Sequence, residues 1–301
     1  MEDKMSERLS KCPLCKSARF LNYSEITDFA VTGEKFILCK CSDCQLLFTN
    51  PRPGQTEIGP YYNFPEYFSH EDKAKSITQW IYQKVRNYNI SKKVDFIEQY
   101  KKKGKLLDYG CGTGEFLRAA KSKGWKVAGI EPNDKARHQA NLKLKDRIKE
   151  SIEETDQNTR YDIITLFHVL EHIHDLRKTT KRVLNHLKSS GYILIAVPNH
   201  DSWDGKKYGK FWAGWDIPRH LYHFNSNSIT AFKDEFGLEL IETKPMKFDS
   251  FYVSLLSEGY LDKEAPLLKK YWNAFFAGLK SNKMASKPGE YSSNIFVFKR
   301  K

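Results

Sequence analysis

A glycine-rich loop between an expected strand and an expected helix constrains the fold of this chain more than any other feature. The segment LLDYGCGTGEFL, residues 106–117, opens with an apolar run that ends at Asp108 and closes with a helical pattern from about Glu115. Three glycines alternate between these two elements: Gly110, Gly112 and Gly114. Alternating glycines let the backbone turn sharply after a strand and approach a ligand at the N-terminus of the following helix. The segment therefore predicts a ligand-binding loop in an α/β domain.

Short apolar runs alternate with charged helical segments from Gly104 onward. The expected strands are residues 106–109, 127–130, 161–167 and 192–197, with two later strands at 238–243 and 295–299. Alternation of this kind is typical of a doubly wound parallel sheet with helices on both faces. We therefore expect an α/β domain over residues 104–301, preceded by a helical pattern over residues 76–100.

Acidic residues around the glycine loop indicate which nucleotide it holds. Glu131 follows Gly110 by 21 residues and ends the next expected strand, where a carboxylate can accept hydrogen bonds from both ribose hydroxyls. The dinucleotide fingerprint G-x-G-x-x-G does not fit, because the third glycine arrives one residue early. Asp108, just before the loop, would repel a pyrophosphate but suits an ammonium group.

The pattern D-x-G-x-G-x-G resembles motif I of class I S-adenosylmethionine-dependent methyltransferases. The resemblance implies a Rossmann-like, seven-stranded methyltransferase sheet that is mostly parallel, with an antiparallel last strand. It also implies that Asp108 and the loop glycines hold the methionine part of S-adenosylmethionine and that Glu131 holds the ribose. Phe167, at the end of the 161–167 strand, is expected beside the same cofactor, since ligands bind at the carboxyl ends of strands in open α/β sheets.

Three later segments resemble a narrower subgroup, related to ubiquinone-biosynthesis O-methyltransferases. They are RYDIITLFHVLEHIHD (160–175), VLNHLKSSGYILIAVPN (183–199) and PRHLYHFNSNSITAFKDEFGLEL (218–240). The second of these resembles a helix, a turn and the fifth strand, with Ser189-Ser190-Gly191 at the turn where the subgroup often has Pro-Gly-Gly. The resemblance covers nearly the whole chain from Gly104 onward.

Two C-x-x-C pairs precede this domain, Cys12 with Cys15 and Cys41 with Cys44, and 25 residues separate them. Two such turns can place four thiolates around one tetrahedral zinc ion, and a closed four-cysteine site is structural rather than catalytic. Cys39 is a spare thiol, and exchanging it for Cys41 would give a C-x₄-C pair instead.

The cysteine segment also matches the resembling subgroup. Many of its members begin with a cysteine ribbon followed by an NPRP run, which stands here at residues 50–53. Lys16 and Gln45 replace the glycines that often follow each cysteine pair. This departure affects the expected conformation of the two turns more than the identity of the ligands. We expect a zinc ribbon over residues 1–55 and an aromatic and helical linker or lid over residues 56–103.

The charge and hydropathy of the 301-residue chain indicate where it acts. No apolar run approaches the roughly 18 residues of a membrane helix, and the charged N-terminal segment MEDKMSERLSK lacks the apolar stretch of a secretory signal. We therefore expect a cytoplasmic protein without a membrane span, whose six cysteines are reduced and available as ligands. The net charge of +13 is compatible with nucleic acid as a partner, although the lysines are spread along the chain.

Residues 168–172 read H-x-x-E-H, the pattern of inverted zinc peptidases. Such a site needs both histidines one turn apart on a regular helix, together with a third ligand. Here a β-rich run delivers His168 at the edge of a sheet, so we expect the match to be accidental. His168 is then a wall between cofactor and acceptor, whereas His172 and His174 are expected to be structural or to face solvent.

Methyl transfer from an activated sulfonium depends mainly on proximity and alignment. If the acceptor is a hydroxyl, a histidine that titrates near neutral pH can remove its proton. His220, in PRHLYHF, is the first candidate for this catalytic base, followed by His223 and His168. Trp212 and Trp215 either close over the acceptor or pack against the cysteine module.

The sequence thus predicts an enzyme that transfers a methyl group from S-adenosylmethionine to a small-molecule acceptor, at a hydroxyl of a quinone-like, sugar or lipid-linked compound. Two other functions stay open. One is an RNA base methyltransferase that uses the zinc ribbon to bind RNA, and the other is a non-catalytic protein that binds the cofactor or a partner. The sequence does not set the acceptor, the methylated atom or the oligomeric state.

Overall fold

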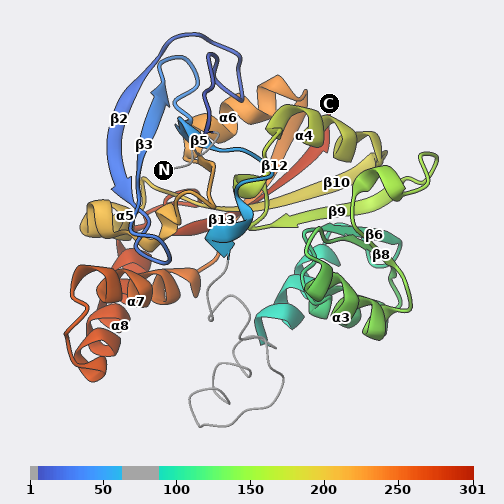
Figure 1. Ribbon diagram of the computed structural model, residues 1–301. Helices are drawn as coiled ribbons and strands as arrows, with labels where there is room; N and C mark the ends of the chain where they lie inside the picture. The colour runs from blue at the N-terminus through green and yellow to red at the C-terminus, as the bar shows by residue number, and fades with distance from the viewer. Residues whose placement is uncertain (1–5, 63–87) are drawn as a thin grey trace. The chain divides into compact units, whose positions relative to one another are not determined.

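The structure is a computed structural model that describes residues 6–62 and 88–301, and Figure 1 traces its elements. The chain divides into two compact units, and each is built from segments that are far apart in the sequence. Among the described residues, unit 1 comprises 6–62, 168–177 and 195–297, and unit 2 comprises 88–167, 178–194 and 298–301. The first part of the expected helical pattern, residues 76–87, lies outside the described residues.

Unit 2 is built on the expected repeat of strand, loop and helix. Its elements are β6 (Lys105–Tyr109), α2 (Glu115–Ser122), β7 (Lys126–Ile130), α3 (Asp134–Leu144), β8 (Ile148–Lys149), β9 (Tyr161–Phe167), most of α4 (Leu176–Asn185) and the first part of β10 (Leu187–Pro198). β6 pairs in parallel with β7 and β9, so that Leu106 lies beside Val127 and Ile163. Residues 88–97 form a helix before β6 and bury Val94 and Ile97.

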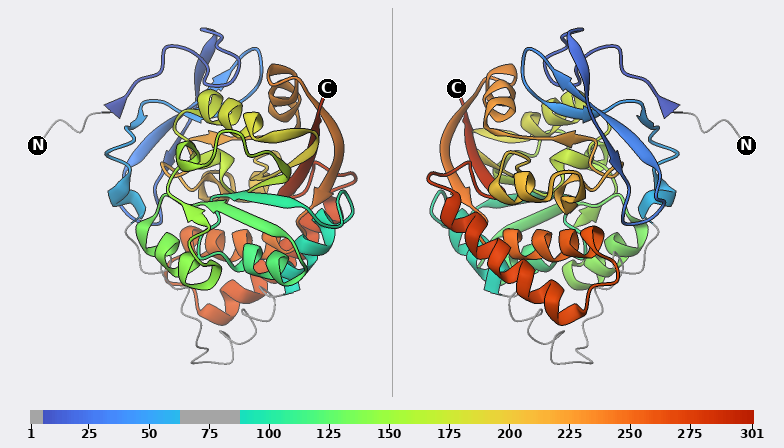
Figure 2. Two further views of the ribbon diagram at one scale, coloured as in Figure 1. Left: turned by 90° about the vertical axis from the view of Figure 1, so that its right-hand side faces the viewer. Right: turned by 90° about the vertical axis from the view of Figure 1, so that its left-hand side faces the viewer.

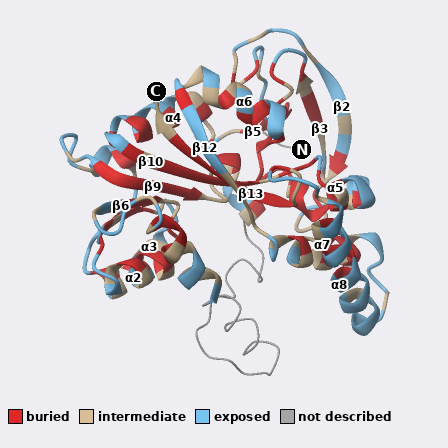
Figure 3. Ribbon diagram, turned by 180° about the vertical axis from the view of Figure 1, so that it is seen from behind, coloured by how far each residue is buried: buried red, intermediate tan, exposed pale blue. Residues whose placement is uncertain are grey.

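These strands belong to one seven-stranded sheet. Its order is β8-β7-β6-β9-β10-β13-β12, with β12 at Leu238–Pro245 and β13 at Ser293–Arg300. Counted along the chain the order is 3-2-1-4-5-7-6, and the last strand is antiparallel to the parallel ones. β9 is buried along almost its whole length, as expected of a strand covered on both faces of a sheet (Figure 3). The expected Rossmann-like, seven-stranded sheet is confirmed.

The start of β10 differs from the turn expected at residues 189–191. β10 begins at Leu187 and runs through this segment without a break. A Cβ on Gly191 would lie 3.0 Å from the carbonyl oxygen of Asp162, so a glycine here allows close approach to the start of β9. The residue that suggested a turn therefore serves strand packing.

The cysteine module in unit 1 takes an edge strand from a distant part of the chain. β2 (Phe20–Thr27), β3 (Lys35–Cys41), β4 (Leu47–Thr49) and β11 (Tyr222–His223) form an antiparallel sheet in the order β11-β4-β3-β2. A short pair, β1 (Ser6–Glu7) with β5 (Arg52–Pro53), flanks the module in sequence. The ribbon and the segment around residue 222 therefore fold together.

Trp212 and Trp215 pack against this module. They share a hydrophobic core whose other buried members are Ile26, Leu38, Leu47, Tyr208, Ile217 and Ala277. The two tryptophan rings meet edge to face, with centroids 5.4 Å apart. Of the two roles that the sequence left open for these tryptophans, the structure shows packing against the cysteine module.

Unit 1 also contains the helices α5 (Trp203–Tyr208), α6 (Ser226–Glu235), α7 (Asp249–Leu261) and α8 (Leu267–Met284). α7 and α8 lie side by side (Figure 2), and a Cβ on Gly278 would be only 2.5 Å from the ring of Phe251. α8 leaves a row of large apolar side chains exposed: Leu267, Leu268, Tyr271, Trp272, Phe275, Phe276 and Leu279. Within residues 6–62 and 88–301, none of the helices has the length and apolar character needed to span a membrane.

Candidate functional site

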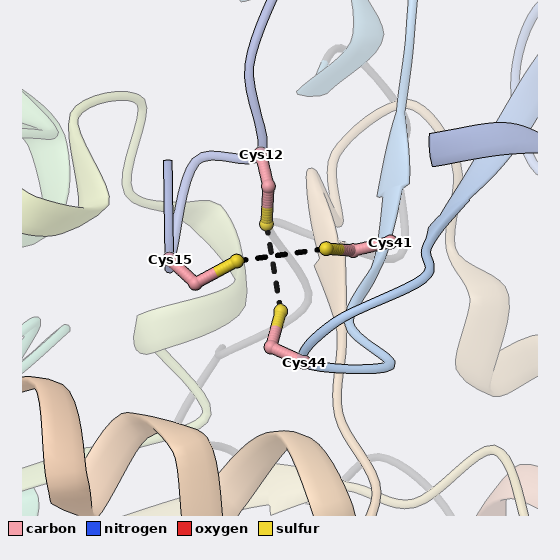
Figure 4. A group of neighbouring side chains, drawn as sticks. All are labelled: Cys12, Cys15, Cys41 and Cys44. Carbon is pink, nitrogen blue, oxygen red and sulfur yellow. Dashed lines mark hydrogen bonds between the residues drawn. The ribbon is translucent and has the colours of Figure 1, made fainter. Parts of the chain in front are cut away.

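Four cysteines of the ribbon converge on one point. Their sulfur atoms all lie within 4.8 Å of one another, and Figure 4 shows Cys12, Cys15, Cys41 and Cys44 directed toward a common centre. Cys12 faces Cys44 and Cys15 faces Cys41, each at a sulfur–sulfur distance of 3.5 Å. Tetrahedral Zn–S bonds of about 2.3 Å would place the sulfurs about 3.8 Å apart, so the four thiols fit a zinc ion.

The two C-x-x-C turns have the same backbone geometry. The amide of Lys16 donates to the carbonyl of Cys12 at 3.0 Å, and the amide of Gln45 donates to the carbonyl of Cys41 at 3.1 Å. Lys16 and Gln45 have left-handed backbones, with φ of 64° and 62°. These are the positions where the resembling subgroup often has glycine, so the turns form in spite of the backbone strain of a non-glycine residue.

Cys39 lies outside this cluster. Its thiol lies 3.5 Å from the side-chain oxygen of Asn22 and 3.8 Å from the carbonyl of Asn50. Burial raises the pKa of Cys39, which keeps it protonated. The structure groups Cys41, and not Cys39, with the other three candidate ligands.

The glycine loop joins β6 to α2 in unit 2. Gly110, Gly112 and Gly114 have φ of 75°, 54° and 77°, a backbone region that favours glycine. At Gly114 a Cβ would also lie 3.1 Å from the Cβ of Ala140 on α3, so both packing and backbone require glycine there. A Cβ at Gly112 would meet nothing within 4 Å, so this glycine faces open space.

Asp108 is buried at the end of β6. Its Oδ1 accepts a hydrogen bond from Thr165 Oγ1 at 2.6 Å. Burial raises the pKa of Asp108 to about 7, although Thr165 and Lys93 oppose the shift. A carboxyl in this state gains from a cationic ligand, because a nearby positive charge offsets the desolvation of its charged form.

Glu131 follows β7 and bonds back to the glycine loop. Its Oε2 accepts from the amide of Gly112 at 2.8 Å, and its Oε1 accepts from the amide of Asn133 at 2.9 Å. Burial raises the pKa of Glu131, while these two amides oppose the shift. The structure thus brings Glu131 and the glycine loop together, as the sequence pattern indicated.

Phe167 ends β9 and packs on α2. Its ring meets Phe116 edge to face with centroids 5.4 Å apart, and the ammonium of Lys93 lies 4.5 Å from its centroid. Sequence reasoning did not single out Thr165 or Lys93. Thr165 could have been found, because it precedes Phe167 by two residues on the same strand face. Lys93 lies on a separate helix and gives no comparable signal.

His168, in unit 1, does not share a regular helix with His172. It has a left-handed backbone with φ of 58°, and residues 170–172 form a 3₁₀ turn. Its Nε2 lies 3.1 Å from Asp249 Oδ2, and its Nδ1 lies 3.5 Å from Glu171 Oε1. Burial opposes its charge, but Asp249 and Glu171 outweigh this and raise the pKa of His168 to about 9. A charged imidazole is unsuited to act as a base at neutral pH.

Glu171, His172 and His220 form a second cluster, here named the histidine cluster. One potential ligand atom from each residue lies within 4.8 Å of the others, and the two imidazole centroids are 4.6 Å apart. Burial and the neighbouring His220 lower the pKa of His172 to about 4. His172 has the structural role that was one of its two expected roles, because its Nδ1 bonds to the carbonyl of Arg219, and its ring lies beside the first candidate base.

The other two histidines of these segments have different surroundings. His174 Nε2 donates to the carbonyl of Pro53 at 3.0 Å, which is the structural role expected of it. His223 is buried with its ring centroid 5.1 Å from that of Trp215, and burial lowers its pKa well below the ordinary value. His220 therefore stays the first candidate among the histidines that sequence reasoning proposed as a base.

Comparison with known proteins identifies a family. A family model described as "Methyltransferase domain" matches residues 82–243, which is more than half of the chain.

Curated relatives are similar at low identity. The ubiquinone biosynthesis O-methyltransferase of Rickettsia canadensis (strain McKiel) is 23% identical over an alignment of 160 residues, which covers 48% of this chain and 66% of the relative. The protein of the same name from Rhodopseudomonas palustris (strain BisB5) is 30% identical over an alignment of 105 residues, which covers 32% of this chain and 41% of the relative. The match thus spans less than two thirds of either relative.

A solved structure titled coclaurine N-methyltransferase bound to N-methylheliamine and SAH is also similar. Its TM-score is 0.49 at 13% identity, over 71% of this chain and 70% of that one.

Proposed function

The chain belongs to the methyltransferase domain family, and on this premise we propose that it transfers a methyl group from S-adenosylmethionine to a hydroxyl of a small-molecule acceptor. The observation that carries the proposal is the arrangement in unit 2 of a buried Asp108, three loop glycines with left-handed backbones and a Glu131 bonded to that loop. A loop of this kind lies where nucleotides bind in open α/β sheets.

The methyl donor is proposed to bind at these residues. Asp108 would pair with the donor's ammonium group, which its raised pKa favours. Glu131 would accept hydrogen bonds from the ribose hydroxyls, in exchange for part of its bonding to the loop amides. The open space at Gly112 would let the donor approach the backbone, and Phe167 would line the same end of the sheet.

A quinone-like or lipid-linked acceptor is favoured over a sugar. Curated relatives are named as O-methyltransferases of ubiquinone biosynthesis, which supports a hydroxyl as the methylated group. The exposed apolar row of α8 supports an acceptor that is apolar or presented at an apolar surface, because contiguous exposed apolar patches mark sites of interaction.

His220 is proposed to assist removal of the acceptor's proton. S-adenosylmethionine supplies a methyl group that is already activated, so the chain mainly has to align the acceptor and exclude water. Nδ1 of His220 bonds to the carbonyl of Gly214 at 3.0 Å, which leaves Nε2 as the nitrogen that can accept a proton. His168, held charged by Asp249 and Glu171, is proposed to position a polar group of the acceptor instead.

The cysteine cluster is proposed to bind one structural Zn²⁺ through Cys12, Cys15, Cys41 and Cys44. Four thiolates complete a tetrahedral site and leave no position for a substrate. The ion would tie residues 12–15 to residues 41–44 and so fix the ends of the β2–β3 hairpin. Reduced thiols of this kind persist in a reducing compartment, so we also propose a cytoplasmic location.

Labelled S-adenosylmethionine incubated with the protein and a fractionated cell extract tests the acceptor. We expect label in a small-molecule fraction that enters organic solvent. Label in RNA would replace the proposal with an RNA base methyltransferase. Tight donor binding with no labelled product in any fraction would indicate a non-catalytic binding protein.

The variant Asp108→Asn tests the donor site. Donor affinity of the wild type should fall by about tenfold for each pH unit below 7, because only the ionised carboxyl pairs with the ammonium. Asp108→Asn should bind weakly at pH 7 and lose this pH dependence, as titration calorimetry would measure. Asp234→Asn, an exposed residue at the end of α6, is the matched control. Equal affinities of Asp108→Asn and wild type would refute the site.

A further inference from the structure

We propose that the histidine cluster, Glu171, His172 and His220, binds one divalent transition-metal ion separate from the cysteine cluster. One potential ligand atom from each residue lies within 4.8 Å of the others. Ligands about 2.1 Å from a shared ion lie up to about 4 Å apart, so a small adjustment of side chains brings all three onto one ion.

Both imidazole rings are held in the way that metal-binding histidines are held. A carbonyl oxygen can only accept a hydrogen bond, so Nδ1 of His172 donates to Arg219 and Nδ1 of His220 donates to Gly214, each at 3.0 Å. In a neutral imidazole this leaves Nε2 without a proton and able to act as a ligand. A backbone carbonyl that accepts from the other ring nitrogen is the usual partner of a metal-ligating histidine, because it fixes the tautomer and the orientation.

Glu171 supplies a buried carboxylate whose pKa is held below its ordinary value, because the charges of the neighbouring histidines outweigh burial. Its side chain is 1% exposed, and neither carboxylate oxygen has a hydrogen-bond partner among the described residues. Its ion pair with His168 Nδ1 is long, at 3.5 Å, and the other nitrogen of that ring lies nearer to Asp249, at 3.1 Å. A buried carboxylate is costly unless it is paired or coordinates a metal, and a metal ion would add direct ligation to the long pair with His168.

The ligand set selects the kind of ion. Two imidazole nitrogens and one carboxylate suit Zn²⁺, Mn²⁺, Fe²⁺ or Co²⁺, whereas Ca²⁺ and Mg²⁺ prefer sites made of oxygen ligands. Three protein ligands also leave coordination positions open, which a four-cysteine site does not. The histidine cluster is therefore a site that could bind a further oxygen ligand.

The role of the ion rests on the proposed function. An acceptor hydroxyl that takes an open position would lose its proton to solvent more readily, because the cation stabilises the developing negative charge. The oxygen–carbon bond then forms as the donor's sulfur–carbon bond breaks. His220 would serve this step as a ligand and not as a base, so the two roles are distinguished by whether methyl transfer depends on the metal.

Binding of Mn²⁺ by the full chain, with zinc already on the cysteines, tests the site. Mn²⁺ is the probe because thiolate sites select zinc over it. The loss of the electron paramagnetic resonance signal of free Mn²⁺ should show one bound ion per chain. Pulsed measurements on the bound ion should show nitrogen couplings from two imidazoles. The affinity should fall by at least about tenfold in Glu171→Gln and in His172→Ala. His138→Ala, which removes an exposed histidine of α3, should bind as the wild type does.

Two controls distinguish a loss of metal binding from a loss of folding or of activity. Circular dichroism and zinc content show whether each variant is folded, and the nitrogen couplings test the wild type without any substitution. A wild type that binds no Mn²⁺, or a folded Glu171→Gln that binds it unchanged, would overturn the proposal. Normal Mn²⁺ binding in a protein that transfers no methyl group would count against the proposed function alone.

Discussion

The two candidate metal clusters of unit 1 differ in how the chain brings their ligands together. In the cysteine cluster, each C-x-x-C turn places two thiols by its own backbone geometry, so only the meeting of two turns depends on the fold. In the histidine cluster, the neighbours Glu171 and His172 meet His220 from another segment. A local pattern therefore reveals the first cluster in the sequence, whereas the second exists only in the folded chain.

The two clusters also differ in the chemistry that a bound ion could support. The cysteine cluster has four equivalent ligands, so an ion there can support the fold but has no position left for chemistry. The histidine cluster mixes a carboxylate with two imidazoles and lies beside the charged His168. We therefore expect substitutions in the first cluster to act on stability and substitutions in the second to act on binding and activity.

Cys12→Ser should have the largest effect on stability. Loss of one ligand should release the zinc and lower the free energy of unfolding by several kcal/mol, because structural zinc contributes an apparent binding free energy of about 10–16 kcal/mol in zinc-finger peptides. Zinc analysis and urea denaturation would measure both quantities. Cys39→Ser is the matched control, expected to keep the zinc and to cost about 1 kcal/mol. Equal zinc loss in the two variants would show that the ligand set is wrong.

Much of the fold could be predicted because its signals are local. The central strands β6, β9 and β10 are mainly buried apolar runs, and β6 is marked by the glycines that follow it. The turn expected at residues 189–191 was wrong, since Gly191 is required by the approach of β10 to Asp162 and not by a change of direction. A glycine that allows close packing and a glycine that forms a turn are the same residue type, so one sequence cannot distinguish the two roles.

The candidate site could be predicted only in part, for the same reason. Asp108, the loop glycines and Glu131 follow successive strands, and parallel strands bring their carboxyl ends to one edge. The histidine cluster depends on a contact between residues 171–172 and residue 220, and no spacing encodes that contact. The H-x-x-E-H pattern is typical of two metal-binding histidines on one regular helix. This chain does not have that helix, because the backbone of His168 is left-handed and its ring is turned to Asp249.

The charge on His168 should make stability depend on pH when the protein carries zinc on its cysteines and no further divalent ion is added. The pKa of about 9 in the folded chain exceeds the ordinary 6.5, so the folded chain holds the proton more tightly than the unfolded chain. The resulting stabilisation is fully present below pH 6.5 and is lost as the pH rises through 9.

The variant His168→Asn measures this stabilisation, because asparagine tolerates the left-handed backbone and carries no charge. Urea denaturation of wild type and variant should give a difference in the free energy of unfolding that shrinks from about pH 6 to about pH 9.5. A difference that stays constant over this range would mean that packing of the ring, and not its charge, stabilises the fold.

The smallest expected effect on stability concerns the backbone strain in the two cysteine turns. A left-handed backbone costs a non-glycine residue about 1–2 kcal/mol, and replacement by glycine removes this strain while increasing the entropy of the unfolded chain. Lys16→Gly should therefore raise the free energy of unfolding by about 0.5 kcal/mol. Gln45→Gly should gain less, because it also loses the hydrogen bond from Gln45 Nε2 to the carbonyl of Ser42.

Lys40→Gly, in β3, is the control for these two variants and should destabilise the protein, since glycine weakens a strand. If neither turn variant gains stability in the zinc-loaded protein, the strain assigned to Lys16 and Gln45 is already relieved by the metal-bound turn.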